Sequence, residues 1–294
     1  MSKNLLLPYP IFVFLFAFFC QIQPSFAINV QQLSNLYPVD KDLISRGNLQ
    51  LANKNQVNYH YEQISLNGKA YQIGIFEKQP IGKVRYLVVH DSEDASFDSG
   101  LQSLVNHGGR MVVLENHEKR GLYDQISQSE TKIDPNRIFF YDENNPLDEQ
   151  DLYLFSQYIL EKLNLKSDSL LLALHNNSRY SRFGLNFIDE LGDIRVACRH
   201  DREQKNLFWF TQNDFKNFDK NQLINNICQN DFNVVVENVG EITDKSLSNF
   251  THFHDIDYVN IEIKMAKKGN GKSEMDTKNA QIRYINFLLK SLEK

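Results

Sequence analysis

Cysteine and net positive charge are both scarce in this sequence. The chain has three cysteines in 294 residues, too few for a disulfide-rich scaffold or for a zinc module with four thiolate ligands. Its 37 acidic residues outnumber 32 basic ones, and the formal net charge is −5. The sequence therefore does not favour broad electrostatic binding to nucleic acid or anionic lipid, although a local basic patch would be compatible with it.

Long apolar runs are also lacking, and the one notable run lies at the N-terminus. Residues 11–19 are apolar, Lys3 precedes them, and residues 25–27 (Ser-Phe-Ala) place small side chains where a signal peptidase reads. We predict a secretory signal over residues 1–27, because the run is short for a membrane span. An uncleaved anchor is an alternative, whereas lipidation at Cys20 is disfavoured by the bulky residues before it.

Export predicts a periplasmic or secreted protein with no stable membrane insertion after cleavage, because no later stretch approaches the roughly 20 apolar residues that a bilayer requires. The mature chain keeps Cys198 and Cys228. An oxidising compartment would allow a disulfide between them, and two buried thiols fit the sequence equally well.

Strands and helices alternate along the mature chain, and 41% of all residues are hydrophobic, as in ordinary globular proteins. This alternation predicts a single α/β domain with a mainly parallel mixed sheet and helices on both faces. We expect residues 28–80 to carry a β-hairpin around Asn67-Gly68 and to pack on a catalytic domain at 81–294. Strands are expected at 83–90, 111–115, 136–141, 169–175, 233–237 and 258–264, and helices at 95–106, 152–165 and 277–292.

Polar side chains follow or interrupt three of these strands. The first strand ends in His90 with Glu93 three residues later, another ends in His175, and the last carries Glu262 within an apolar run. Ligands of open α/β sheets bind beyond the carboxyl ends of the strands. Two imidazoles and one carboxylate form the ligand set of a catalytic zinc site, and a second carboxylate is the general base that such a site needs.

The order of these motifs resembles the zinc carboxypeptidase family, whose superfamily includes the succinylglutamate desuccinylase and aspartoacylase branch. The resemblance covers roughly residues 80 to 290 and depends on the ordered set, since His-x-x-Glu alone is a weak signal. Its pieces are HDSE (90–93), DPNRIF (134–139), LALHNN (172–177) and YVNIEI (258–263). The resemblance implies that His90, Glu93 and His175 bind Zn²⁺.

The resemblance also implies that Glu262 is the general base, with Glu237 at the end of its own strand as the competing choice. Asn136 and Arg137 would bind the terminal carboxylate of a substrate, because a guanidinium meets a carboxylate with two parallel hydrogen bonds. Arg120 stands at about the position of the oxyanion-stabilising arginine, although a solvated loop charge would explain it equally well. The family's substrate-covering tyrosine has no secure counterpart here.

Other tempting features are discounted. The alternating histidines at 252–255 are interpreted as surface residues, and residues 267–272 (KKGNGK) as a solvated loop without phosphate-loop register. No Gly-x-Ser-x-Gly elbow is present, and neither mature cysteine has a reactive context, so covalent catalysis has little support.

The sequence thus predicts an exported zinc-dependent amide hydrolase, a carboxypeptidase acting on a peptide with a free C-terminal carboxylate. Export makes a cell-wall peptide a plausible substrate. One alternative is an N-acyl amino acid amidohydrolase with the same metal site. The other is a non-catalytic binding module with a degenerate site. The oligomeric state is not indicated.

Overall fold

The computed structural model describes residues 29–33, 41–66, 69–116, 120–123, 132–140, 147–177, 182–200, 203–240, 245–265 and 271–293. The strands are β1 (Asn29–Leu33), β2 (Asn58–Leu66), β3 (Lys69–Lys78), β4 (Val84–Val88), β5 (Gly109–Glu115), β6 (Leu122–Tyr123), β7 (Lys132–Ile133), β8 (Leu170–Asn177), β9 (Ile194–Cys198), β10 (Leu207–Thr211), β11 (Val234–Glu237) and β12 (Asp257–Lys264). The helices are α1 (Lys41–Ile44), α2 (Asn48–Lys54), α3 (Asp94–His107), the 3-10 turn η1 (Pro135–Arg137), α4 (Leu147–Leu163), α5 (Leu185–Ile188), α6 (Lys220–Gln229), α7 (Leu247–Phe253) and α8 (Gly271–Leu292).

Ten strands form one mixed sheet in the order β1-β2-β3-β5-β4-β8-β12-β10-β11-β9. The central pairings β5/β4, β4/β8 and β8/β12 are parallel, as is β10/β11, and the remaining pairings are antiparallel. Because β4, β8 and β12 are parallel neighbours, their carboxyl ends meet at the same edge of the sheet. The α/β fold expected from the sequence is confirmed.

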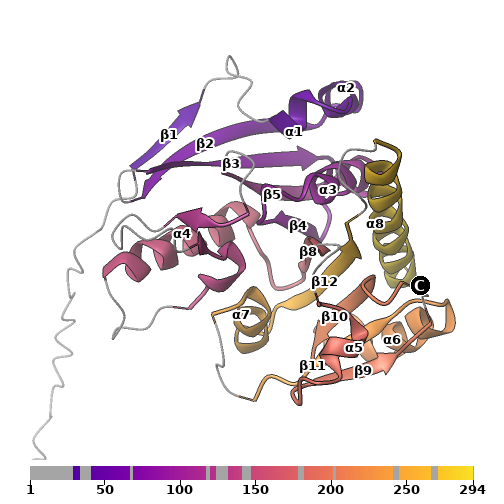
Figure 1. Ribbon diagram of the computed structural model, residues 1–294. Helices are drawn as coiled ribbons and strands as arrows, with labels where there is room; N and C mark the ends of the chain where they lie inside the picture. The colour runs from indigo at the N-terminus through magenta and orange to yellow at the C-terminus, as the bar shows by residue number, and fades with distance from the viewer. Residues whose placement is uncertain are drawn as a thin grey trace, which may run out of the picture.

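Helices cover both faces of the sheet, with α3 and α8 on one side and α4 and α7 on the other (Figure 1). Along β8, Leu172 and Leu174 pack into the core under α3 and α8, whereas Leu171 and Ala173 face the core under α4 and α7. Double coverage explains why these strands read as continuous apolar runs. Strand alternation then turns the side chain of His175 toward the α4 and α7 face.

The helices expected at 95–106, 152–165 and 277–292 are confirmed as α3, α4 and α8, and both α4 and α8 begin earlier than expected. The strand expected at 136–141 is wrong, because η1 occupies its first residues and no strand follows in the described part up to residue 140. Pro135 cannot donate to a sheet ladder, and Asp134 accepts the Asn136 N–H instead, which stabilises the turn.

The N-terminal hairpin is confirmed in its strands: β2 and β3 pair antiparallel up to Leu66 and Lys69, and β3 continues into the main sheet through β5. The Asn-Gly turn of this hairpin lies outside the described residues. So do the expected secretory signal at 1–27 and most of the tract at 267–272. The domain boundary near residue 80 stays a prediction. In the part of the chain that is described, no helix has the length and apolar character needed to cross a bilayer.

A disulfide joins Cys198 at the end of β9 to Cys228 in α6. The sequence left this pairing open. Disulfides form and persist in oxidising compartments, so the bond points to an extracytoplasmic location. It also ties the edge strand of the sheet to the helix that packs beside it, across a separation of 30 residues.

We expect the double variant Cys198→Ser with Cys228→Ser to lower the free energy of unfolding by about 3–4 kcal/mol, because opening a loop of this length restores entropy to the unfolded chain. Urea denaturation followed by circular dichroism measures this loss. The wild-type protein under strong reductant should show the same reduced midpoint. An unchanged midpoint in both experiments would contradict a stabilising role for the bond.

Candidate metal centre

Two candidate ligands come from one tight turn after β4. This strand ends at Val88, and the Glu93 N–H donates to the carbonyl oxygen of His90 at 3.0 Å, which closes the turn before α3 begins. The turn is fastened to the end of β5, because Asp91 Oδ2 accepts a hydrogen bond from the Asn116 N–H at 2.6 Å. As a result, His90 Nδ1 lies 3.0 Å from Glu93 Oε1.

The third candidate ligand stands on the neighbouring parallel strand β8. His175 Nδ1 lies 3.1 Å from His90 Nδ1 and 3.6 Å from Glu93 Oε2. The side chains are buried, with Glu93 only 1% exposed, and their ligand atoms all lie within 4.8 Å of one another. Among the described residues this is the one group of three potential metal-binding side chains with such geometry. We refer to these three residues as the triad.

Glu93 carries a buried negative charge that its neighbours stabilise. Burial raises the pKa of its carboxyl, but the charges and hydrogen bonds of His90 and His175 outweigh this effect and hold the pKa well below its usual range. For His90, burial lowers the pKa, whereas Glu93 and Asp134 raise it, and the net pKa is about 9. In the metal-free protein, a proton on His90 therefore compensates the Glu93 charge, and a cation must displace that proton to bind.

The donor atoms of the triad fit zinc. Two imidazole nitrogens and a carboxylate oxygen are the donor types of a catalytic zinc site, which leaves a fourth position for water or substrate. Both imidazoles present the same ring atom, Nδ1, to the Glu93 carboxylate. A metal-binding triad typical of zinc hydrolases is thus present.

A carboxylate outside the triad orients His90. Asp134 Oδ1 lies 2.8 Å from His90 Nε2 and also accepts the Asn136 N–H at 2.9 Å. Metal-binding histidines generally donate their second ring N–H to such a group, which fixes the ring. His175 Nε2, in contrast, is buried without a hydrogen-bond partner among the described residues. Asp134 is not among the site residues that the sequence predicts. Its position before Pro-Asn-Arg, which is typical of a turn cap, is the local signal for its role.

The proposed substrate-binding pair follows Asp134 and Pro135. Asn136 and Arg137 form part of η1, so the same turn that contacts His90 presents them. Asn136 Oδ1 is buried without a hydrogen-bond partner among the described residues. Arg137 is exposed, and its charge acts on the pKa of Glu237. The pair therefore combines a solvent-accessible cation with a buried amide oxygen, in a turn that Asp134 links to His90.

Arg120 also reaches the triad. Its Nη1 donates to Glu93 Oε1, the oxygen that faces His90 Nδ1. The side chain remains 53% exposed, so it enters the site from the solvent side. The structure thus brings Arg120 to the metal centre rather than leaving it as an isolated loop charge.

The two candidate bases lie in different surroundings. Glu262 pairs in register with His175 across β12 and β8, and it accepts a hydrogen bond from Asn260 Nδ2 at 2.9 Å. Burial raises the pKa of Glu262, which the charge of His175 partly offsets. Glu237 instead accepts a hydrogen bond from Trp209 Nε1 at 2.8 Å. Glu262 therefore lies beside the triad, whereas Glu237 is hydrogen-bonded to the indole of Trp209 in β10.

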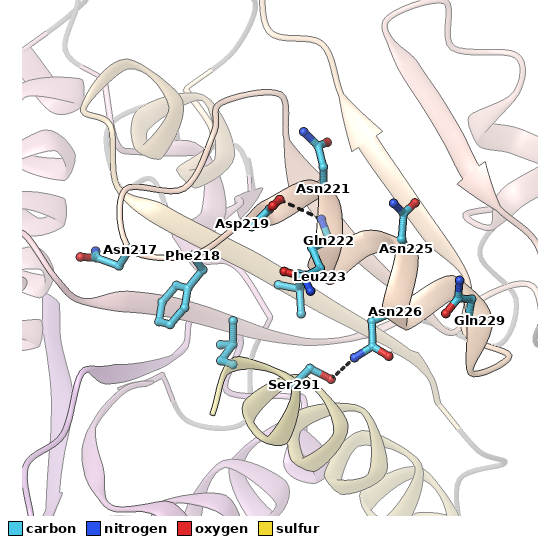
Figure 2. A pocket seen from close by; sticks show the side chains of 11 residues that line it. Asn217, Phe218, Asp219, Asn221, Gln222, Leu223, Asn225, Asn226, Gln229 and Ser291 are labelled. Atoms are coloured by element: carbon cyan, nitrogen blue, oxygen red, sulfur yellow. Dashed lines mark hydrogen bonds between the residues drawn. The ribbon is translucent and has the colours of Figure 1, made fainter. Parts of the chain in front are cut away.

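A cleft of about 830 Å³ lies elsewhere, between α6 and the end of α8 (Figure 2). Asparagine and glutamine side chains line much of it, and Asn226 Nδ2 donates to Ser291 Oγ at 3.0 Å. Its one carboxylate, Asp219, accepts the Gln222 N–H and caps α6. No triad residue lines this cleft, so it is separate from the candidate metal site.

Comparisons with known proteins give loose structural matches. No family model and no curated protein matches the sequence. The structure is similar to an aspartoacylase family protein from Mesorhizobium loti, with a TM-score of 0.42 at 10% identity over 81% of this chain and 67% of that one. A succinylglutamate desuccinylase/aspartoacylase from Rhodobacter sphaeroides gives 0.42 at 11% over 81% and 65%. The Legionella pneumophila LapA aminopeptidase gives 0.39 at 10% over 84% and 62%.

We expect the mature protein to bind one zinc ion, and His90→Ala or His175→Ala each to weaken binding at least about 100-fold, because two remaining donors hold the ion poorly against water. Elemental analysis after dialysis measures the zinc content. His107→Ala is the matched control, since His107 bonds Asn286 at 2.7 Å, away from the triad. Full zinc content in both triad variants would exclude this metal site.

Proposed function

We propose that this protein is an exported zinc-dependent amide hydrolase that removes the C-terminal residue of a peptide. The observation that carries the proposal is the buried triad, whose turn is hydrogen-bonded through Asp134 to the turn that holds Asn136 and Arg137. This link supports a metal site and a carboxylate-binding cation in neighbouring turns. The disulfide supports the exported location, for which cell-wall peptides are a plausible substrate.

One metal ion and four side chains would take part in the proposed reaction. Zinc, when bound, would polarise the scissile carbonyl and increase the acidity of the attacking water. Glu262 would take a proton from that water and return it to the leaving amine as the C–N bond breaks. Asn136 and Arg137 would hold the terminal carboxylate of the substrate, and Arg120 would stabilise the oxyanion of the tetrahedral intermediate.

The surroundings of Glu262 support its assignment as the base. A general base works best when its pKa lies near the working pH, and burial raises the pKa of this carboxyl. The residue is 9% exposed and is adjacent in register to His175, which supports a role in activating a water at the proposed metal site. Asn260 holds one of its oxygens, which leaves the other for proton transfer.

Arg120 must move for the site to work as proposed. Arg120 contacts Glu93 Oε1, an oxygen of the carboxylate that would bind the metal. A cation bound by Glu93 would replace this contact and leave the half-exposed Arg120 guanidinium available to the oxyanion. Arg120 would thus neutralise Glu93 in the metal-free protein and the oxyanion during the reaction.

An amidohydrolase for N-acyl amino acids would use the same triad and the same Arg137, because such a substrate also carries a free carboxylate. A screen on C-terminally free peptides, C-terminally blocked peptides and N-acyl amino acids, with and without chelator, separates the two activities. A non-catalytic binding module would show no turnover in any arm and no stoichiometric zinc.

We expect Arg137→Ala to reduce kcat/KM for a peptide with a free C-terminal carboxylate by roughly ten- to a hundredfold, because a charge-assisted pair contributes about 1.5–3 kcal/mol. The C-terminal amide of the same peptide serves as the control substrate and should lose much less. Steady-state kinetics on the two peptides measures the difference. Equal losses on both would mean that Arg137 does not recognise a carboxylate.

We expect Glu262→Gln to retain zinc and the fold but to lower kcat at least about 100-fold, within the range for a lost general base. Glu237→Gln is the matched control and should stay within a few-fold of wild type, since Glu237 is held by Trp209 rather than by the triad. Swapped outcomes would move the base to Glu237. Loss of zinc from Glu262→Gln would make Glu262 a ligand.

A further inference from the structure

We propose that Gln281 of α8 is a positioning residue that sets the relative placement of the metal ligands and the base from behind the sheet. Its side chain is fully buried, with 0% exposure, on the α3 and α8 face, opposite the face to which His175 turns. The inference rests on the metal centre proposed above. Gln281 has no role in the proposed reaction steps, because it contacts neither the triad side chains nor the expected substrate.

One carboxamide connects the segments that carry the site. Gln281 Nε2 donates to the carbonyl oxygen of His175 at 3.2 Å and to that of Ile261 at 3.4 Å. The first carbonyl belongs to a proposed metal ligand, and the second belongs to the residue before Glu262. The side chain therefore bridges β8 and β12 where the ligand and the base stand side by side in register.

The same carboxamide reaches the start of α3, which follows Glu93 directly. Gln281 Oε1 accepts a hydrogen bond from Ser99 Oγ at 2.9 Å, and Gln281 Nε2 lies 3.5 Å from Ser96 Oγ. Gln281 Oε1 also accepts a hydrogen bond from Asn176 Nδ2 at 3.2 Å. Its two donors and its acceptor are thus all engaged, as a buried amide requires.

Asn176 completes the link to the metal-binding carboxylate. Its backbone N–H donates to Glu93 Oε2 at 2.7 Å, while its side chain holds Gln281. A shift of Gln281 is therefore transmitted to Glu93 through Asn176 and to His175 through its own carbonyl. Buried networks of this kind strengthen one another and specify one arrangement when every member is satisfied.

Gln281 could in principle stabilise only the fold, and zinc affinity distinguishes the two roles. Residues that orient metal ligands typically change metal affinity or activity by about 10- to 100-fold when they are replaced. A residue that only stabilises packing lowers the unfolding midpoint without changing the affinity of the folded site. Leu288 is the matched control, because it lies two turns along the same buried face of α8 and contacts the apolar core.

The test compares Gln281→Met, which keeps the length of the side chain without its hydrogen bonds, with Leu288→Ala, which removes apolar packing. We expect Gln281→Met to raise the zinc Kd at least about tenfold and to lower kcat, with KM for the substrate within about threefold. Leu288→Ala should lower Tm at least as much, yet leave the zinc Kd within about twofold. Chelator competition measures Kd at a temperature where all variants are folded.

A zinc Kd and kcat of wild-type size in Gln281→Met, together with a lowered Tm, would overturn the positioning role. Should Gln281→Met fail to fold, Ser99→Ala removes one bond to the carboxamide and should raise the zinc Kd by about threefold; no change there would also overturn it. Absence of stoichiometric zinc from the wild-type protein would contradict the proposed function instead. The two failures are therefore distinguishable.

Discussion

The negative charge of Glu93 is the constraint on which the site depends. A carboxylate that is almost completely removed from water is costly unless positive charge and hydrogen-bond donors surround it. Here His90, Arg120 and the Asn176 N–H supply them, each from a different segment of the chain. The Glu93 carboxylate thus links the turn after β4 to β8 and to Arg120 before β6. No one of these segments supplies enough partners to bury the charge alone.

The central strands make this convergence possible. Because β4, β8 and β12 run in the same direction, residues that end each strand become neighbours although they are far apart in sequence. The α4 and α7 face then carries His175 and the proposed base Glu262, while the α3 and α8 face carries Gln281, the proposed positioning residue. The candidate ligand His175 and the side chain of Gln281 thus lie on opposite sides of the same sheet, and both are buried.

Periodic features were predictable from the sequence, and contacts between distant side chains were not. The buried strands β4, β5, β8 and β12 and the helices α3, α4 and α8 follow from apolar runs and helical spacing. The proximity of His90, Glu93 and His175 could be expected from strand ends. The sequence wrongly predicts a strand at 136–141 because the aromatic residues of this run favour a strand. Pro135 and the Asp134 cap instead stabilise a turn. No local pattern indicates that Gln281 meets Ser99 across 182 residues.

In the proposed reaction, the turn at Asp134 bears on the size of the group that would be cut away. A single carboxylate oxygen contacts both the His90 ring and the backbone N–H of Asn136, so the turn that carries Arg137 is tied to a proposed metal ligand. If Arg137 binds the terminal carboxylate of a substrate, the length of this turn would set the distance between the substrate's C-terminus and the bond that is cleaved. Evolution could then change the length of the released fragment by inserting or deleting residues in this turn, without altering a single metal ligand.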